Sequence, residues 1–167
     1  MTVANVRKKS NGRQRQRGNT MVESAFALLP LFILIFGIID FSMAIFLRST
    51  LQNAVREGVR YAVTYQVMSG SCQDDSIRTV VKNNSVGFIN SSNTSMVTVR
   101  YYVPSNLTTP VTGTNSNFPG NVVEIGVEGY NWNWMAPLSR GSSALTMNLY
   151  SADVMEGLPG GVNPPCR

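Results

Sequence analysis

The feature that most constrains this chain is a long run without charge near its N-terminus. Residues 24–39 carry no charged side chain, and Asp40 is the one charge between Ser24 and Leu47. As a helix that rises about 1.5 Å per residue, the run from Ser24 to Leu47 would extend roughly 36 Å, enough to cross a hydrocarbon core of about 30 Å. A buried helix of a soluble protein is the alternative, but the rest of the chain is too small to surround it. The run therefore predicts one transmembrane helix, placed at residues 19–47.

The charge on either side of this run predicts its orientation. Residues 1–18 hold six basic side chains and no acid, so they account for the net charge of +5, while the rest of the chain is close to neutral. Positive segments stay on the cytoplasmic side of a membrane, so we expect a basic cytoplasmic leader and an extracytoplasmic remainder. A basic tail alone could bind nucleic acid. Because this one directly precedes an apolar span, we expect membrane lipid as the partner and no nucleic acid.

A cleaved secretory signal is an alternative interpretation of the same region. Ser42-Met43-Ala44 offers a small-x-small cleavage site after a basic region and an apolar core. Against this, the apolar run exceeds the usual length of about 7–15 residues. The apolar pattern also resumes at Ile45, directly after the site.

Beyond the span, the spacing of apolar residues becomes that of an amphipathic helix. We expect one continuous helix over about 22–66, in which residues 48–66 pack on a domain formed by residues 67–167. That domain should contain a short second helix at 74–88 and three strands, since its apolar residues alternate there. The strands are expected at 96–103, around 123–127 and at 145–150. The predicted fold is α+β, a single-pass membrane protein whose long helix covers one face of a small antiparallel sheet.

Three residues of the apolar helix stand out. Glu23 and Asp40 are separated by about 25 Å along a helix, so each can lie near one membrane interface. Pro30 removes a backbone donor, which predicts a kink or a loosened turn. We expect Glu23, Pro30 and Asp40 to shape the helix and the way it packs.

The chain has two cysteines, Cys72 and Cys166, which flank the outer domain. They form no CxxC pair, so a zinc or redox motif is disfavoured. Because an exported domain lies in a compartment that permits disulfides, we expect a Cys72–Cys166 bridge rather than two free thiols. Closing such a long loop could stabilise the domain by up to about 4–5 kcal/mol.

Nothing in the sequence favours catalysis. The chain has no histidine, which excludes imidazole acid–base chemistry and His-ligated metal sites. Glu124 and Glu128 share one strand face, where we expect them to be solvated. Trp132 and Trp134 could form a recognition patch, but we favour a place at the edge of the core. We expect no catalytic residue, no metal and no cofactor.

The junction between the leader and the helix carries a specific motif. Gly18-Asn19-Thr20-Met21-Val22-Glu23 resembles a prepilin-peptidase site, in which a basic leader ends in Gly and Glu stands fifth after the cut. The run continues through Leu29-Pro30, Phe36-Gly37 and Asp40 to Arg56-Glu57-Gly58. Over residues 18–63 the chain resembles the TadE-like family, pseudopilins of the tight-adherence (Flp) pilus system. It departs from that pattern at Asp40, where the family more often has Glu, and at Asn19, an unusual first mature residue.

The resemblance implies a function and a set of partners. It implies a pilin-like structural protein of the bacterial inner membrane, needed for pilus assembly or adhesion and without catalysis of its own. Its partners would be prepilin peptidase, which cuts after Gly18, other pilins or pseudopilins, and the pilus assembly machinery. The competing hypothesis is a membrane-anchored or secreted binding module, with the tryptophans or the loop at 105–120 as ligand surface. The mature N-terminus distinguishes them: Asn19 for a pseudopilin, Ile45 for a secreted protein and Met1 for a plain anchor.

Overall fold

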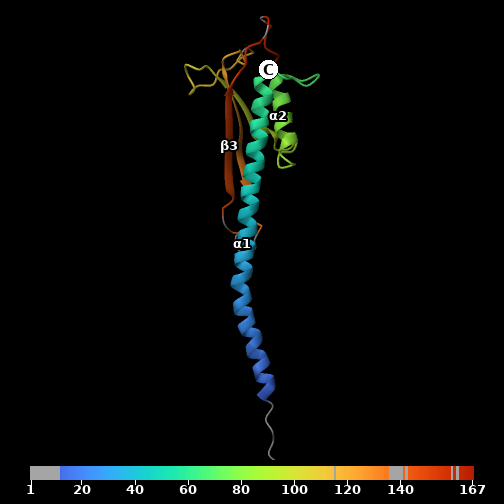
Figure 1. The fold of residues 1–167 in the computed structure, drawn as a ribbon, viewed down its shortest axis with the longest axis vertical. Coiled ribbons are helices and arrows are strands. Elements are labelled where there is room, and N and C mark those ends of the chain that lie inside the picture. Colours follow the sequence, from blue (N-terminus) through green and yellow to red (C-terminus); the bar gives the residue numbers. More distant parts are fainter. Residues whose placement is uncertain (1–11, 115, 136–140, 142, 159, 161) are drawn as a thin grey trace, which may run out of the picture.

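A computed structural model describes residues 12–114, 116–135, 141, 143–158, 160 and 162–167. Its helices are α1 (Gly12–Val63) and α2 (Gln73–Asn84), and its strands are β1 (Val97–Tyr102), β2 (Val122–Trp132) and β3 (Leu145–Val154). A short 3₁₀ turn, Thr94–Met96, precedes β1. The C-terminal half of α1 packs with α2 and the sheet, while its N-terminal half projects alone (Figure 1). The predicted α+β fold, with a long apolar helix on a small antiparallel sheet, is confirmed.

Helix α1 differs from the prediction at both ends. It begins at Gly12 rather than near residue 22, because residues 13–17 are all Arg or Gln, which are good helix formers. It ends at Val63 rather than 66, because Tyr65 adopts a positive φ of 53° and its N–H bonds back to the Ala62 carbonyl at 3.0 Å. The helix continues through Pro30 without interruption.

Helix α2 is shorter than predicted. It ends at Asn84 rather than 88. The Ser85 hydroxyl accepts a hydrogen bond from the backbone N–H of Ile89 at 3.0 Å, and Val86 has a φ of 53°, which a continuing helix does not allow. The chain therefore turns away four residues earlier than the apolar spacing suggested.

The sheet is a simple antiparallel meander in the order β1-β2-β3. Alternate residues of β1 and β2 are buried, as their period-2 patterns predicted, and one face of the sheet is covered by the helices. In β3 only Met147 and Leu149 of the predicted alternation are buried, while Leu145 is 39% exposed. Both β2 and β3 run longer than expected. The register between them shifts at Gly129, which has a φ of 69° and donates its N–H to the Asn148 side chain at 2.8 Å. This bulge interrupts the alternation of side chains along β2, so the sequence pattern did not predict that the strand continues beyond residue 127.

The core lies where α1, α2 and the sheet meet. Leu51 of α1 and Ile125 of β2 are completely buried, as are most of their apolar neighbours. The helices pack closely at Gly58, because a Cβ placed there would lie 2.6 Å from Cγ2 of Val81 in α2. The amphipathic half of α1 is thus a packing surface, and the covered face of the sheet is its counterpart.

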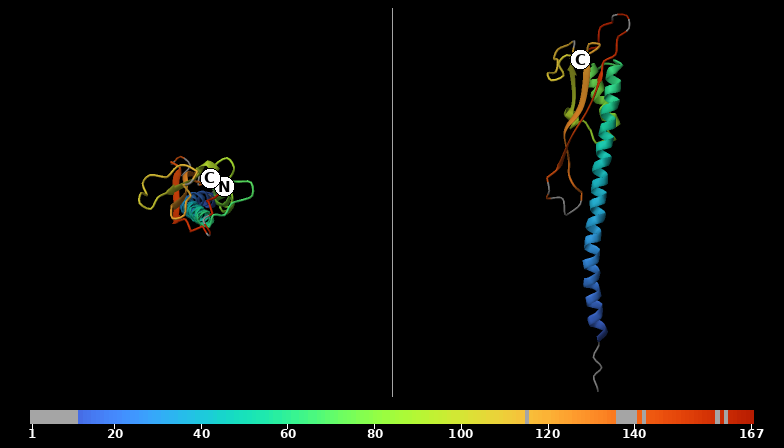
Figure 2. Two further views of the ribbon diagram at one scale, coloured as in Figure 1. Left: turned by 90° about the horizontal axis from the view of Figure 1, so that it is seen from above. Right: turned by 60° about the vertical axis from the view of Figure 1, so that its left-hand side comes forward.

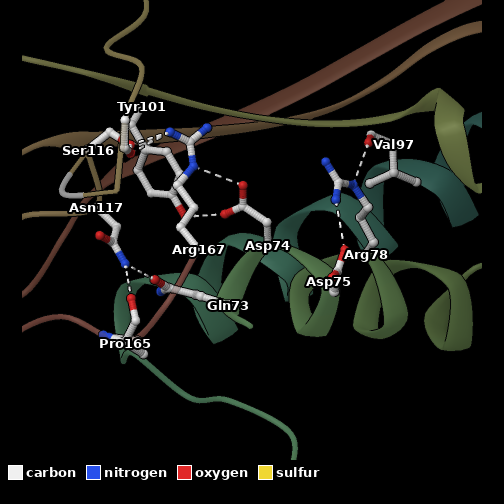
Figure 3. Close-up of polar contacts among 11 residues, drawn as sticks. Gln73, Asp74, Asp75, Arg78, Val97, Tyr101, Ser116, Asn117, Pro165 and Arg167 are labelled. Carbon is white, nitrogen blue, oxygen red and sulfur yellow. Dashed lines mark hydrogen bonds and ion pairs between the residues drawn. The ribbon is translucent and has the colours of Figure 1, made fainter. Parts of the chain in front are cut away.

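The C-terminus is attached to the start of α2. Cys72 and Cys166 form a disulfide with Cα atoms 4.9 Å apart. Beside it, the Arg167 Nε donates to Asp74 Oδ2 at 2.9 Å, and the guanidinium lies 4.7 Å from the centre of the Tyr101 ring (Figure 3). The Tyr101 hydroxyl donates to the other Asp74 oxygen at 3.0 Å, and burial, aided by that carboxylate, raises the Tyr101 pKa.

Candidate membrane and assembly interface

The N-terminal half of α1 presents an uncovered apolar surface. Every residue from Thr20 to Ile39 is exposed, although nearly all are apolar. In the described part of the chain, α1 is the single helix long and apolar enough to cross a membrane. Its place at the N-terminus and its low burial fit a membrane anchor rather than a core helix.

The residues of the predicted processing site lie at the start of this surface. Gly18 and Asn19 are part of α1, and Glu23 is exposed one helical turn further on. Among the described residues, Glu23 has no hydrogen-bond or ion-pair partner, whereas the neighbouring Ser24 hydroxyl donates to the Thr20 carbonyl at 2.8 Å. The Glu23 carboxylate is thus available to headgroups or to another molecule.

Asp40 lies at the opposite end of the exposed surface and is in a very different environment. Its side chain is only 4% exposed, and Oδ1 accepts a hydrogen bond from the backbone N–H of Met135 at 2.9 Å. Met135 follows β2, so the connection between β2 and β3 reaches down to this point of α1. In Figure 2 (right) the lower ends of these strands extend further along α1 than α2 does. Among the described residues, Asp40 is therefore the first residue of α1 that the outer domain buries, inside the range 19–47 expected to span the membrane.

The sequence did not predict the contact between Asp40 and Met135. The one indication of it was a single acid within an apolar run.

The expectation that Glu124 and Glu128 are simply solvated was also wrong. Both carboxylates lie on the sheet face away from α1 and pair with Arg100, at 3.4 Å and 2.6 Å. The hydrogen bond from Arg100 lowers the pKa of Glu128. The two glutamates therefore neutralise a basic residue instead of forming a free acid pair.

The two tryptophans lie near the lower end of the sheet. Trp132 is half-buried and packs against the core, as the core-edge interpretation predicted. The Trp134 Nε1 donates to the carbonyl of Ser143 at 3.2 Å, which joins the two sides of the β2–β3 connection. Among the described residues, no cluster of three metal-ligating side chains occurs.

A comparison with known families agrees with this division of the helix. Residues 18–60 match the family model described as TadE-like protein. The chain carries a TadE-like segment. No curated protein and no solved structure matches the chain. The TadE-like segment begins at Gly18 and ends near the last packed turn of α1, so it includes both the exposed surface and most of the surface that packs on the sheet.

Proposed function

We propose that this protein is a pseudopilin-type structural subunit that supports assembly of tight-adherence pili and thereby surface adhesion. The observation that carries the proposal is that the TadE-like match falls on a helix with two distinct halves. One half is apolar and uncovered, and the other is the spine of a small α+β domain. Such a helix can be stored in a membrane and later packed against the helices of other subunits. The role proposed is structural, without catalysis.

The same proposal gives the protein a location. The helix spans the bacterial inner membrane, with residues 1–18 in the cytoplasm and the outer domain in the periplasm. The concentration of basic side chains before the helix supports this orientation, because positive segments resist translocation. The disulfide at the far end of the domain is consistent with an oxidising compartment.

Processing and assembly are connected through Glu23. We propose that prepilin peptidase cuts after Gly18, which creates a charged α-amine on Asn19. Along one straight helix, Glu23 lies about 6 Å above Asn19, a poor alignment for a bond within one chain. The exposed carboxylate is better placed to meet the amine of a neighbouring subunit, since burying either charge alone in an apolar environment is costly. That pairing would set the axial register between subunits.

A substitution pair tests this role. Glu23→Gln keeps the shape of the side chain and removes its charge, so we expect insertion and processing to continue while pilus formation and co-purification with pilus components are lost. Glu57→Gln, on the same helix but in its packed half, is the matched control and should leave pili normal. Normal pili with Glu23→Gln would contradict the pairing role.

Intact mass of the membrane-extracted protein tests the processing step. In cells with an active prepilin peptidase, we expect the mature chain to begin at Asn19, and Gly18→Ala should retain the leader. A product beginning at Ile45 would instead support the secreted binding module, and one beginning at Met1 a plain anchor.

A further inference from the structure

We propose that the turn after α2, residues 85–88, is a membrane-contacting tip, which rests in the headgroup layer on the outer side of the bilayer and contacts anionic phospholipid there. The structure describes this turn without gaps, and its apolar side chains are Val86 and Phe88. The occupant of this surface is the phospholipid headgroup layer. The inference rests on the proposed insertion of α1 into a membrane but not on pilus assembly.

The direction of α2 brings this turn toward the apolar half of α1. At the start of α2, the Gln73 side chain donates to the Ala62 carbonyl near the C-terminal end of α1 at 3.0 Å. After the end of α2, the Phe88 ring lies 6.2 Å from the ring of Phe46 in an edge-on contact. Helix α2 therefore runs antiparallel to α1, and its C-terminal end is the one nearer to the uncovered half of α1 (Figure 1).

The length of the span gives the height of Phe46. Glu23 is charged, so we place it at the inner boundary of the hydrocarbon. Counted from Ser24, a hydrocarbon core of about 30 Å takes about 20 residues of helix and ends near residue 43. Phe46 lies about 4.5 Å further along the helix, whereas the headgroup layer on each side of the core is about 5–7 Å thick. The Phe88 ring that packs on Phe46 therefore lies within the outer headgroup layer.

The exposed apolar surface of α1 continues up to this level. Phe41, Ile45 and Phe46 are 64%, 54% and 51% exposed. Asp40 does not interrupt the surface, because it is only 4% exposed and accepts a hydrogen bond from the backbone N–H of Met135. The turn after α2 is thus continuous with the surface proposed to lie in the membrane, which makes phospholipid its occupant.

The backbone of the turn is strained at Val86. This residue has a φ of 53°, and a β-branched residue in the left-handed region is strongly disfavoured. Its side chain is also 72% exposed, so burial in the core does not offset the strain. Strained residues cluster where a protein contacts a ligand. Contact with lipid removes the apolar side chain from water and so offsets the strain.

Basic side chains flank the apolar tip. Lys82 is in the last turn of α2, and by the same count along the helix Arg48 of α1 lies at the outer edge of the headgroup layer. Among the described residues, neither is in an ion pair, and the Lys82 Nζ donates to the Ser91 hydroxyl at 3.0 Å. The acids of α2 lie in its first turn, at the opposite end. Lys and Arg beside apolar side chains attract anionic headgroups, so this composition suits a phospholipid surface.

A tryptophan reporter makes the contact measurable. The full-length protein carries Trp132→Phe and Trp134→Phe, which remove the native tryptophans, together with Phe88→Trp. It is reconstituted in vesicles of phosphatidylcholine and phosphatidylglycerol, whose acyl chains carry bromine either near the carbonyl group or near the terminal methyl. We expect bromine near the carbonyl to quench the emission several-fold more than bromine near the methyl.

Leu107→Trp in the same background is the matched control. Leu107 is also apolar and 61% exposed, but it belongs to the loop between β1 and β2, at the end of the domain away from the uncovered half of α1 (Figure 1). We expect bromine at either depth to leave this reporter unquenched.

Val86→Gly, added to the Phe88→Trp reporter, tests the tip itself. Glycine accepts the φ of 53° and removes the apolar side chain, so the circular dichroism of the domain should not change while the shallow quenching falls at least twofold. A merely structural role for Val86 would leave the quenching unchanged. Lys82→Gln should lower the quenching in vesicles that contain phosphatidylglycerol and leave it unchanged in phosphatidylcholine alone. Leu107→Gly is the matched control and should alter neither value.

Four results would overturn the inference. A Phe88→Trp reporter that escapes bromine at both depths, in protein that floats with the vesicles, would show that the turn lies above the membrane and would leave the pilus proposal intact. Equal quenching at both depths would show insertion beyond the headgroups. Quenching that falls as the protein-to-lipid ratio rises would show that a second copy of the chain covers the turn. Protein that does not float would overturn the membrane anchor itself.

Discussion

Gly58 lies at a point of close packing between α1 and α2. Replacing it with Ala in a helix interior normally stabilises by about 1 kcal/mol. Here the added Cβ would lie 2.6 Å from Cγ2 of Val81, whereas apolar carbons prefer a separation of about 3.5–4.0 Å. Val81 is completely buried, so it has little room for the movement of about 1 Å that the contact requires. Overpacking of this kind costs about 1–3 kcal/mol, so Gly58→Ala should change the free energy of unfolding by between nothing and a loss of about 2 kcal/mol.

A double-mutant cycle separates the clash from the change in helix propensity. Val81→Ala removes the Cγ2 atom and leaves a cavity, and the new methyl of Gly58→Ala partly fills it. The double variant should therefore be more stable than the sum of the single effects predicts, by about 1–3 kcal/mol. The assay is denaturant unfolding of the detergent-solubilised chain, followed by circular dichroism of the outer domain.

Gly37 provides the matched control for this cycle. A Cβ there would meet nothing within 4 Å, although the residue lies on the same helix. Gly37→Ala combined with Val81→Ala should thus be additive within about 0.5 kcal/mol. Additivity at Gly58 as well would refute the close contact between α1 and α2.

Two further predictions concern the C-terminal end of the domain. Cys166→Ser should increase protease cleavage near the C-terminus and lower the free energy of unfolding by up to about 4–5 kcal/mol. The reason is that the bridge closes a loop with a sequence separation of 94 residues. Labelling of two free thiols in the non-reduced, denatured wild-type protein would contradict the disulfide. Because the pKa of Tyr101 is raised in the folded chain, the unfolded chain loses this phenolic proton at a lower pH than the folded chain does. The contribution of Tyr101 to the free energy of unfolding is therefore complete below about pH 10 and decreases as the pH rises above that value. Tyr101→Phe should reduce that alkaline slope, measured by tyrosinate absorbance alongside circular dichroism, and an unchanged slope would exclude Tyr101 as its source.

The parts of the fold that the sequence predicted are those with a local period. The packed stripe of α1 repeats every three to four residues, and each strand alternates, so these patterns followed directly from the geometry of helices and strands. Element ends were less predictable. They depend on single residues with unusual backbone angles, such as Tyr65 after α1, Val86 after α2 and Gly129 within β2.

Long-range polar contacts could not be predicted at all. Asp40 and Met135 are 95 residues apart in the sequence, and the donor is a backbone N–H that every residue except proline has. Arg167 likewise binds Asp74 from the far end of the chain. No local pattern connects such pairs, because the fold alone brings them together. The proposed processing site is the opposite case, since the motif that suggests it is contiguous in the sequence.

The different surroundings of the two acids in α1 explain why we assign them different roles. Asp40 is buried and bonded within its own chain, so the domain compensates its charge wherever the helix goes, in a membrane or in a filament. Glu23 is exposed in an apolar surface, and among the described residues it has no partner. Headgroups can solvate it while the helix stays in the membrane, but if the helix is buried among the helices of other subunits, that carboxylate needs a cation as partner. Glu23, rather than Asp40, is therefore the acid whose neutralisation we expect to depend on a neighbouring subunit.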